Sequence, residues 1–301
     1  MNTRLPGALV SMVLTLLVAA TNGYKCDAAA RPDAAQVAEN LRQAGAAVKL
    51  DAHGDVVAVD FGRARPRDFD YSQVSALRDL RSLKCSRQPI TDADARTFTR
   101  LTKLKALALD ETKITDAGLA ATGKLTGLEE LLLANTRVGD AGIENLLGLL
   151  RLKRLRLSGT QITDAGLTRL TAMKSLSDLD VSKTEVGDSG LKQLATLAGL
   201  SRLNLYTTRV TDAGLDSLAS MTGLKWLNLD NTKISDAGLS KLEPLAGLEF
   251  LHLGRTQITD AGLTHLAGMA KLQELHVTHT KVTADGVRQL QQALPTCNIK
   301  H

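Results

Sequence analysis

Hydrophobic positions recur with one fixed spacing through most of this chain. Leucines follow a Leu-x-x-Leu-x-Leu pattern, as at Leu152, Leu155 and Leu157, and a Thr-Asp-Ala-Gly phrase or a close variant comes after each pattern. The spacing of 24 residues predicts an array of similar structural units, because self-similarity at a fixed period is typical of repeat proteins. The nine copies of the phrase begin at Thr91, Thr115, Gly139, Thr163, Gly187, Thr211, Ser235, Thr259 and Thr283.

Each repeat combines the pattern of a strand with that of a helix. The Leu-x-Leu segment alternates apolar and variable residues, which predicts a short strand with one buried face. The phrase opens with Thr, Ser or Gly, which are favoured at helix N-caps, and its Asp stands where the helix dipole favours a negative charge. Apolar residues then recur at helical spacing, as at Leu167, Leu170 and Met173.

One repeat cannot be stable alone, because ordering its backbone costs more free energy than its few buried leucines supply. The repeats must therefore stack into an α/β solenoid, with parallel strands on the concave face and short helices on the convex face. We expect about ten repeats over residues 56–284, a capping helix and hairpin at 33–55, and a C-terminal cap at 285–301.

The repeat phrase carries a family resemblance. Its consensus, Leu-x-x-Leu-x-Leu-x-x-Thr-x-Ile-Thr-Asp-Ala-Gly-Leu, resembles exported leucine-rich repeat arrays of planctomycete-type bacteria, and the similarity covers residues 33–301. The resemblance implies a leucine-rich repeat horseshoe that binds protein on its concave face. Thr replaces the usual Asn, so a ladder of threonine hydroxyls is expected at Thr112, Thr136, Thr160, Thr184, Thr208, Thr232, Thr256 and Thr280.

The same phrase is also similar to the substrate-reading repeats of F-box ubiquitin-ligase adaptors. Those repeats have Cys where this chain has Thr, and no F-box is visible in the sequence. A substrate-recognition adaptor of this type is therefore an alternative function.

Residues 1–23 have the pattern of a secretory signal peptide. Arg4 gives a positive start, Ala8–Ala20 is an uncharged stretch, and small residues follow it. The strongly apolar part is short for a membrane span, so we expect cleavage, a linker at 24–32 and no stable span in the mature chain. The protein is then exported to the periplasm, the cell envelope or the medium; an uncleaved anchor is the alternative.

The three cysteines do not predict a disulfide framework, because they are few and odd in number. Cys85 falls at a core position of its repeat, where a thiol behaves as a small hydrophobic group. The other two are Cys26 and Cys297.

The composition argues against nucleic-acid binding. The chain has 37 basic and 32 acidic residues, so its net charge of +5 leaves no large excess of positive charge for one face. One Trp, three Tyr and four Phe among 301 residues are too few for a platform that stacks single-stranded bases. We expect no nucleic-acid partner and a monomeric protein.

The sequence offers little chemistry for an enzyme, and we expect neither catalytic residues nor a cofactor. Gly118–Leu125 imitates the start of a phosphate-binding P-loop, but Leu125 replaces the required Ser or Thr and the stretch falls in a repeat helix. The repeated aspartates could suggest a calcium ladder, yet helix capping explains them more simply.

A basic run at Arg151–Arg156 suggests a polyanion site. Residues at equivalent positions of successive strands nevertheless alternate in sign, as in Glu130, Arg154, Asp178 and Arg202. We therefore expect a solvated cross-strand charge ladder.

The outward strand positions further along the chain form the candidate binding site. Trp226, Phe250 and Tyr206 are the expected anchors, since rigid aromatic side chains supply large contact area at small entropic cost. The partner is expected to be an unidentified protein. The complete predicted set is Arg202, Asn204, Tyr206, Trp226, Asn228, Asp230, Phe250, His252, Glu274 and His276.

Two other interpretations of this region stay open. Trp226 and Phe250 could pack on each other across the sheet. His252 and His276 share one row on neighbouring strands and could form a metal or small-ligand site with Glu274 or Asp230 nearby.

Overall fold

The computed structural model describes residues 33–301 apart from 63, 65 and 67. The predicted signal peptide at 1–23, the linker at 24–32 and Cys26 lie outside the described residues. Asp33–His301 forms one compact unit. No helix within this described part has the length and apolar character needed to cross a membrane.

A 12-stranded sheet runs through the unit, with its strands in sequence order. The first two strands pair antiparallel, and every later strand pairs parallel with the one before it. The strands are β1 (Ala47–Leu50), β2 (Val56–Asp60), β3 (Ser82–Lys84), β4 (Ala106–Ala108), β5 (Glu130–Leu132), β6 (Arg154–Arg156), β7 (Asp178–Asp180), β8 (Arg202–Asn204), β9 (Trp226–Asn228), β10 (Phe250–His252), β11 (Glu274–His276) and β12 (Asn298–Lys300).

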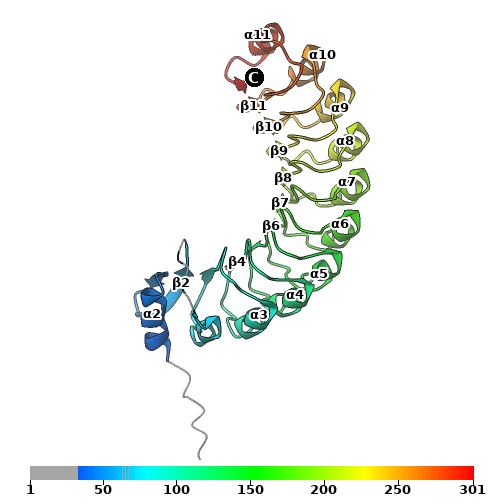
Figure 1. The fold of residues 1–301 in the computed structure, drawn as a ribbon. Helices are drawn as coiled ribbons and strands as arrows, with labels where there is room; N and C mark the ends of the chain where they lie inside the picture. Colours follow the sequence, from blue (N-terminus) through cyan, green and yellow to red (C-terminus); the bar gives the residue numbers. More distant parts are fainter. Residues whose placement is uncertain (1–32, 63, 65, 67) are drawn as a thin grey trace, which may run out of the picture. The chain divides into compact units, whose positions relative to one another are not determined.

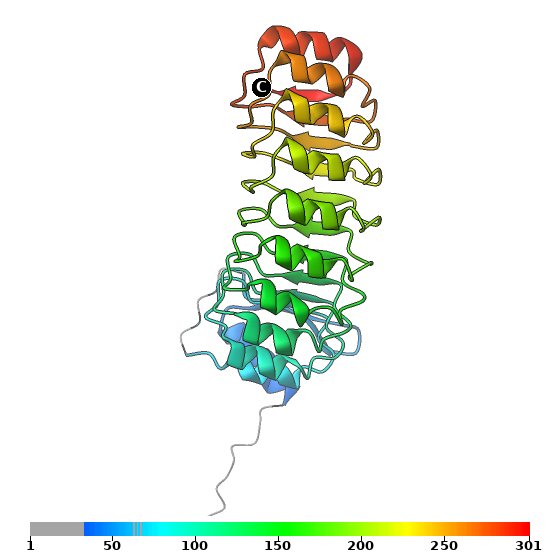
Figure 2. The ribbon, with the colours of Figure 1, turned by 90° about the vertical axis from the view of Figure 1, so that its right-hand side faces the viewer.

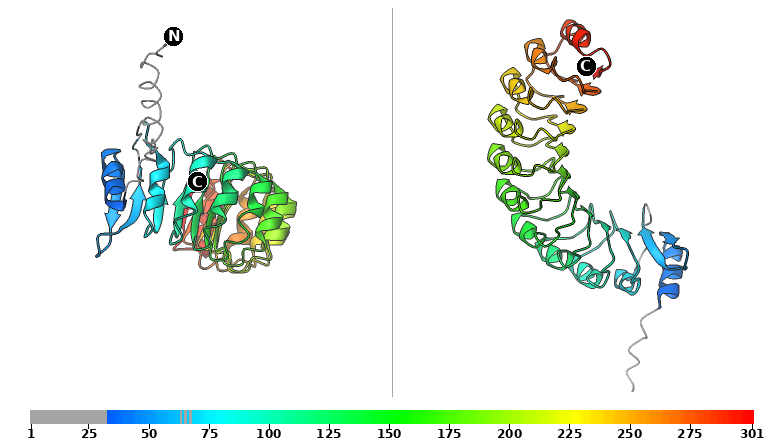
Figure 3. Two further views of the ribbon diagram at one scale, coloured as in Figure 1. Left: turned by 90° about the horizontal axis from the view of Figure 1, so that it is seen from below. Right: turned by 180° about the vertical axis from the view of Figure 1, so that it is seen from behind.

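Helices connect the parallel strands from β3 onward and lie along the outer side of the curved unit, while the strands line its inner side (Figures 1, 2 and 3). This arrangement confirms the predicted α/β solenoid. The helical segments are α2 (Ala34–Gln43), η1 (Tyr71–Ala76), α3 (Asp92–Phe98), α4 (Asp116–Thr122), α5 (Asp140–Glu144), α6 (Asp164–Leu170), α7 (Asp188–Leu194), α8 (Asp212–Leu218), α9 (Asp236–Leu239), η2 (Ser240–Leu242), α10 (Asp260–Leu263), η3 (Thr264–Leu266) and α11 (Ala284–Ala293).

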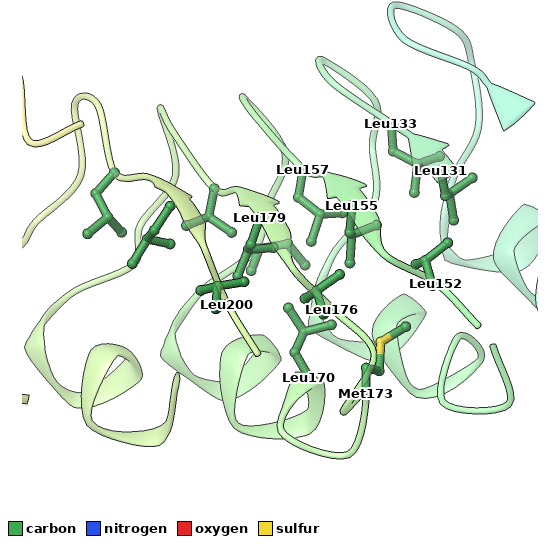
Figure 4. Close-up of a cluster of buried hydrophobic side chains, with 14 of the residues drawn as sticks. Leu131, Leu133, Leu152, Leu155, Leu157, Leu170, Met173, Leu176, Leu179 and Leu200 are labelled. Carbon is green, nitrogen blue, oxygen red and sulfur yellow. The ribbon is translucent and has the colours of Figure 1, made fainter. Parts of the chain in front are cut away.

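The core is a continuous stack of aliphatic side chains between the sheet and the helices. The middle residue of each repeat strand points inward, and Leu155, Leu179 and Leu203 are fully buried in register with one another. Figure 4 shows how leucines from successive repeats meet beneath the strands. Cys85 is also fully buried, as predicted, and desolvation raises the pKa of its thiol.

The aspartate after the first residue of each of the first eight phrases connects one repeat to the next, which differs from the predicted role at its own helix. In α7, Asp188 accepts hydrogen bonds from the Thr211 backbone N–H at 2.8 Å and the Thr211 hydroxyl at 2.7 Å. The same bond to the backbone N–H 23 residues ahead is made by Asp92, Asp116, Asp140, Asp164, Asp212, Asp236 and Asp260.

The glycine of each of the last eight phrases makes room for the aspartate of the preceding repeat. A Cβ atom on Gly214 would overlap the carboxylate of Asp188, and Gly238 stands in the same relation to Asp212. The Asp-Ala-Gly phrase therefore encodes an inter-repeat contact: one repeat supplies the carboxylate and the next leaves space for it. We call this contact the Asp–Gly lock.

The buried threonines do not form a ladder between repeats. The Thr208 hydroxyl donates to the Leu205 carbonyl of its own repeat at 2.7 Å, and Thr232 donates in the same way to Leu229. Each hydroxyl thus satisfies the carbonyl of the residue that directly follows its own strand. The prediction of a hydroxyl ladder between repeats was wrong. A threonine side chain is too short to reach the threonine of the next repeat, and it bonds to its own backbone instead.

Replacing the lock aspartate should weaken the stacking of repeats. We expect Asp188→Ala to lower the free energy of unfolding by about 1.5–3 kcal/mol, because two partly buried hydrogen bonds to a charged group are lost. Asp216→Ala on α8 is the matched control, since the Asp216 side chain is 62% exposed and forms a surface ion pair with Lys241. Urea unfolding should show a change below about 0.5 kcal/mol for this control; equal effects in both variants would contradict a special role for the lock.

The turn after each strand requires a left-handed backbone. Thr207 has a φ of 53°, and the equivalent positions Asn135 and Gly159 have φ values of 55° and 65°. Glycine and asparagine adopt this conformation at little cost, whereas a β-branched residue is strained there.

Relieving this strain should stabilise the protein. We expect Thr207→Asn to raise the free energy of unfolding by roughly 0.5–1 kcal/mol, since the left-handed region costs most residues about 1–2 kcal/mol. Asn135→Thr tests the reverse change in an equivalent turn and should destabilise by a similar amount. Thermal and urea unfolding of both variants would measure the effect, and two changes of the same sign would refute it.

Candidate functional site

Eight of the ten predicted site residues lie in two neighbouring rows on the open face of the sheet. Each strand here has three residues: the middle one is buried and the outer two face away from the core. Strand pairing aligns the first row, Arg202, Trp226, Phe250 and Glu274, and the second row, Asn204, Asn228, His252 and His276. We call these eight residues the β8–β11 surface.

A stack of flat side chains runs along the first row. The Arg202 guanidinium carbon lies 4.5 Å from the centroid of the Trp226 ring. The Trp226 and Phe250 rings are stacked, with centroids 4.8 Å apart and planes 6° from parallel. Both rings are half-buried, and the faces of Trp226 are contacted by Arg202 and Phe250, so the exposed part of this ring is largely its edge. The rings therefore pack on each other and also present a shared apolar edge.

Tyr206 lies apart from this stack, which differs from the predicted row of three rings. It follows β8 in the turn, beyond the two rows. Its ring contacts the Arg255 guanidinium, whose carbon is 5.2 Å from the centroid, and the Lys183 ammonium at 5.6 Å. Tyr206 thus belongs to the edge of the sheet surface.

Asp230 does not face outward as predicted; only 5% of its surface is exposed. Its Oδ1 accepts a hydrogen bond from Arg255 Nε at 2.9 Å, and its Oδ2 accepts a second from Arg255 Nη2. The exposed member of this pair is Arg255, which the sequence analysis missed. Arg255 stands 24 residues after Asn231 and so occupies the same left-handed turn position of the next repeat. This periodic spacing is the signal by which the sequence could have placed Arg255 beside the site.

The two histidines lie together at one end of the second row. Their ring centroids are 4.6 Å apart in an edge-to-face arrangement. His276 Nε2 lies 2.7 Å from Glu274 Oε1, and Lys300 bonds the same oxygen. These two partners lower the pKa of Glu274 to about 2, so this carboxylate is ionised at neutral pH.

His252 is the less usual of the two histidines. Its Nδ1 atom is buried with no hydrogen-bond partner among the described residues, and it lies 3.5 Å from Asp230 Oδ2. Burial lowers the pKa of His252, and the nearby Asp230 opposes this effect only in part. The ring is therefore neutral at neutral pH.

The described residues offer little for a metal ion. None of their His, Cys, Asp and Glu side chains assemble into a group of three able to hold one. Around His252 and His276, the carboxylates of Asp230 and Glu274 already pair with Arg255 and Lys300.

Charged residues on β5 to β8 pair across the strands, as the alternation of signs predicted. Arg154 bonds Glu130 at 3.0 Å on one side and Asp178 at 2.9 Å on the other. Arg202 Nε lies 3.5 Å from the same Asp178 carboxylate. The basic run is thus part of a charge ladder that leads into the β8–β11 surface. The P-loop-like stretch lies mostly in α4, away from this surface.

Burial of His252 makes stability depend on pH. The unfolded chain binds a proton at His252 near the ordinary pKa of about 6.5, whereas the folded protein binds it only at lower pH. Between the lower pKa of the folded protein and about 6.5, unfolding therefore takes up a proton. The free energy of unfolding falls as the pH drops below about 6.5, by at most about 1.4 kcal/mol per pH unit for one group.

We expect His252→Gln to remove this component of the pH dependence. Urea unfolding between pH 5 and 8 should show a smaller loss of stability on acidification than in the wild type. His301→Gln, a change at an exposed histidine, is the control and should keep the wild-type dependence. A His252→Gln variant that loses as much stability as the wild type would contradict the assignment.

Comparisons with known proteins agree with the repeat fold. Residues 152–170, 172–195 and 248–267 match the family model described as Leucine Rich repeat. No curated protein matches the chain in sequence.

Solved structures are similar in fold. The ectodomain of the Arabidopsis receptor kinase HAESA is 18% identical, with a TM-score of 0.63, and the match covers 89% of this chain and 48% of that one. Internalin C2 from Listeria monocytogenes is 24% identical, with a TM-score of 0.53, and the match covers 70% of this chain and 84% of that one. The chain thus contains leucine-rich repeats and folds as a leucine-rich repeat solenoid.

Proposed function

We propose that this protein is a non-enzymatic scaffold that binds another protein through the β8–β11 surface. The observation that carries the proposal is the half-buried stack of Trp226 and Phe250 on the face of the sheet that the helices leave uncovered. Large aromatic side chains in the middle of a surface are the residues that most often supply binding energy.

The stack suits binding because it is already ordered. Arg202 and Phe250 hold Trp226 between them. The strands that carry the two rings, β9 and β10, are each paired with a strand on both sides. A partner therefore does not have to fix the positions of these side chains, which lowers the entropic cost of association.

A protein of similar fold supports the proposal. The HAESA ectodomain was solved in complex with an N-terminally extended IDA peptide hormone ligand. A leucine-rich repeat solenoid can thus bind a peptide ligand. We further propose that the present protein acts as an exported monomer, in keeping with the signal-peptide pattern of residues 1–23.

The alternative functions have less support. A metal or small-ligand site at the histidines would have to break the pairs that Asp230 and Glu274 make with Arg255 and Lys300. A ubiquitin-ligase adaptor rests only on the similarity of the repeat phrase.

Removing both rings should abolish most of the partner binding. We expect the double variant Trp226→Ala, Phe250→Ala to weaken affinity at least tenfold, since a binding hot spot contributes about 2 kcal/mol or more. The measurement is a cross-linking pull-down from cells that produce the protein, followed by titration of the captured partner.

Leu150→Ala is the control, because Leu150 is 67% exposed and lies outside the β8–β11 surface. It should leave affinity unchanged. Unchanged affinity in the double variant, with folding intact by circular dichroism, would place the binding site elsewhere.

A further inference from the structure

Two asparagines on the β8–β11 surface present their amide nitrogens to the open face. Asn204 Oδ1 accepts a hydrogen bond from the Tyr206 N–H at 3.1 Å, and Asn228 Oδ1 accepts one from the Asp230 N–H at 2.9 Å. These bonds fix the orientation of both amides, with the oxygen toward the turn. Within the described part of the chain, neither Nδ2 group has an acceptor, so each offers N–H donors to a ligand.

The turn itself does not require asparagine. At the equivalent position of β7, Asp180 Oδ1 accepts from the Ser182 N–H at 3.0 Å, and in β2 Asp60 accepts from the Gly62 N–H at 2.7 Å. A carboxylate therefore makes the same bond as the asparagine oxygen. What Asn204 and Asn228 add is a pair of amide N–H donors in place of a negative charge.

Two further donors lie beside these amides. The Arg202 side chain is 47% exposed, and its Nε lies 3.5 Å from Asp178 Oδ2. Its terminal nitrogens and the Trp226 indole N–H make no hydrogen bond to other residues that the structure describes. Arg202, Asn204, Trp226 and Asn228 thus form one cluster of N–H donors on two paired strands, which we call the donor cluster.

The acceptors around the donor cluster are already occupied. Asp178 bonds Arg154, Asp230 bonds Arg255, and Glu274 bonds Lys300 and His276. The local surface is therefore rich in donors and poor in free acceptors. Its complement is a ligand that presents carbonyl and carboxylate oxygens.

We infer that the donor cluster binds an extended peptide segment that carries a carboxylate side chain, an inference that rests on the proposed function. Backbone carbonyls match the amides of Asn204 and Asn228, and a carboxylate matches the guanidinium of Arg202. A hollow of about 270 Å³ lies beside Arg202, Asn204 and Trp226 and can take such a side chain. It is also lined by two aspartates and two further arginines, so its three guanidiniums outnumber its two carboxylates; these other charged residues are Asp178, Asp180, Arg154 and Arg156.

The charge balance favours a peptide over a polyanion. Carboxylates lie on both sides of the donor cluster: Asp178 is on β7, next to β8, and Glu274 is on β11, two strands beyond β9. A densely charged sulfated glycan or an anionic membrane would therefore meet repulsion as well as attraction. A peptide with one or two acidic residues can place them at Arg202 and let its apolar side chains pack against the edges of Trp226 and Phe250.

The test is a selection from a phage-displayed library of random ten-residue peptides on the immobilised wild-type protein. We expect the enriched peptides to contain more Asp and Glu than the starting library. One enriched peptide is then compared by fluorescence anisotropy with its analogue in which Asp and Glu are changed to Asn and Gln, which should bind at least tenfold more weakly.

The decisive variant is Asn204→Asp combined with Asn228→Asp. It keeps the acceptor that the turn needs, as Asp180 shows, but removes the amide donors and adds negative charge. We expect at least tenfold weaker binding of the selected peptide. Asn145→Asp, an exposed change at the end of α5, has the same chemistry away from the sheet surface and should bind like the wild type.

Several outcomes would overturn the inference. The selected peptides could lack an excess of Asp and Glu, or the wild-type protein could enrich no peptide at all. The Asn204→Asp, Asn228→Asp variant could also bind the selected peptide as tightly as the wild type does. Tighter binding of heparin or of phosphatidylglycerol vesicles than of any selected peptide, lost in the same variant, would assign the donor cluster to a polyanion instead. The pull-down with the single Phe250→Ala variant judges the proposed function separately, because Phe250 lies outside the donor cluster.

Discussion

The Asp–Gly lock is the contact on which the rest of the structure depends. A carboxylate such as that of Asp188 fills the space that Gly214 leaves and accepts hydrogen bonds from Thr211. The lock satisfies backbone donors at the start of a helix, where an unpaired N–H would be costly. It also fixes the distance and rotation between adjacent repeats, so that buried leucines meet leucines and strands pair in register.

With register fixed by the core and the lock, the outward strand positions are free to vary. The same two rows hold alternating charges on β6 and β7 and then aromatic, amide and imidazole groups from β8 to β11. Neighbouring side chains on this face come from residues 24 apart, such as Trp226 and Phe250. The outward residues therefore determine the binding chemistry of the surface, whereas the core and the Asp–Gly lock determine its geometry.

Much of the fold could be predicted from the sequence because its signals are periodic. The leucine spacing and the N-cap residues identify strands, helices and the solenoid. The Asp–Gly lock could not be predicted in the same way, because its aspartate contacts residues 23 and 26 positions ahead, which it meets only after the repeats stack. Tyr206 was misplaced because the strand ends at Asn204 and the chain then turns, and Asp230 because that turn folds its carboxylate beneath Arg255. Alternation along a strand holds only as far as the strand extends.

The lock also has a consequence for how such a chain changes length. Each repeat places an aspartate carboxylate against the following repeat and leaves space, at its glycine, for the carboxylate of the preceding repeat. These two contact sites are alike in successive repeats from Asp92 to Gly286. A duplicated 24-residue segment would therefore be accepted by both of its neighbours without compensating substitutions. The binding face can thus be enlarged one strand at a time by recombination within the gene, and new outward residues can diverge afterwards on a framework that already fits.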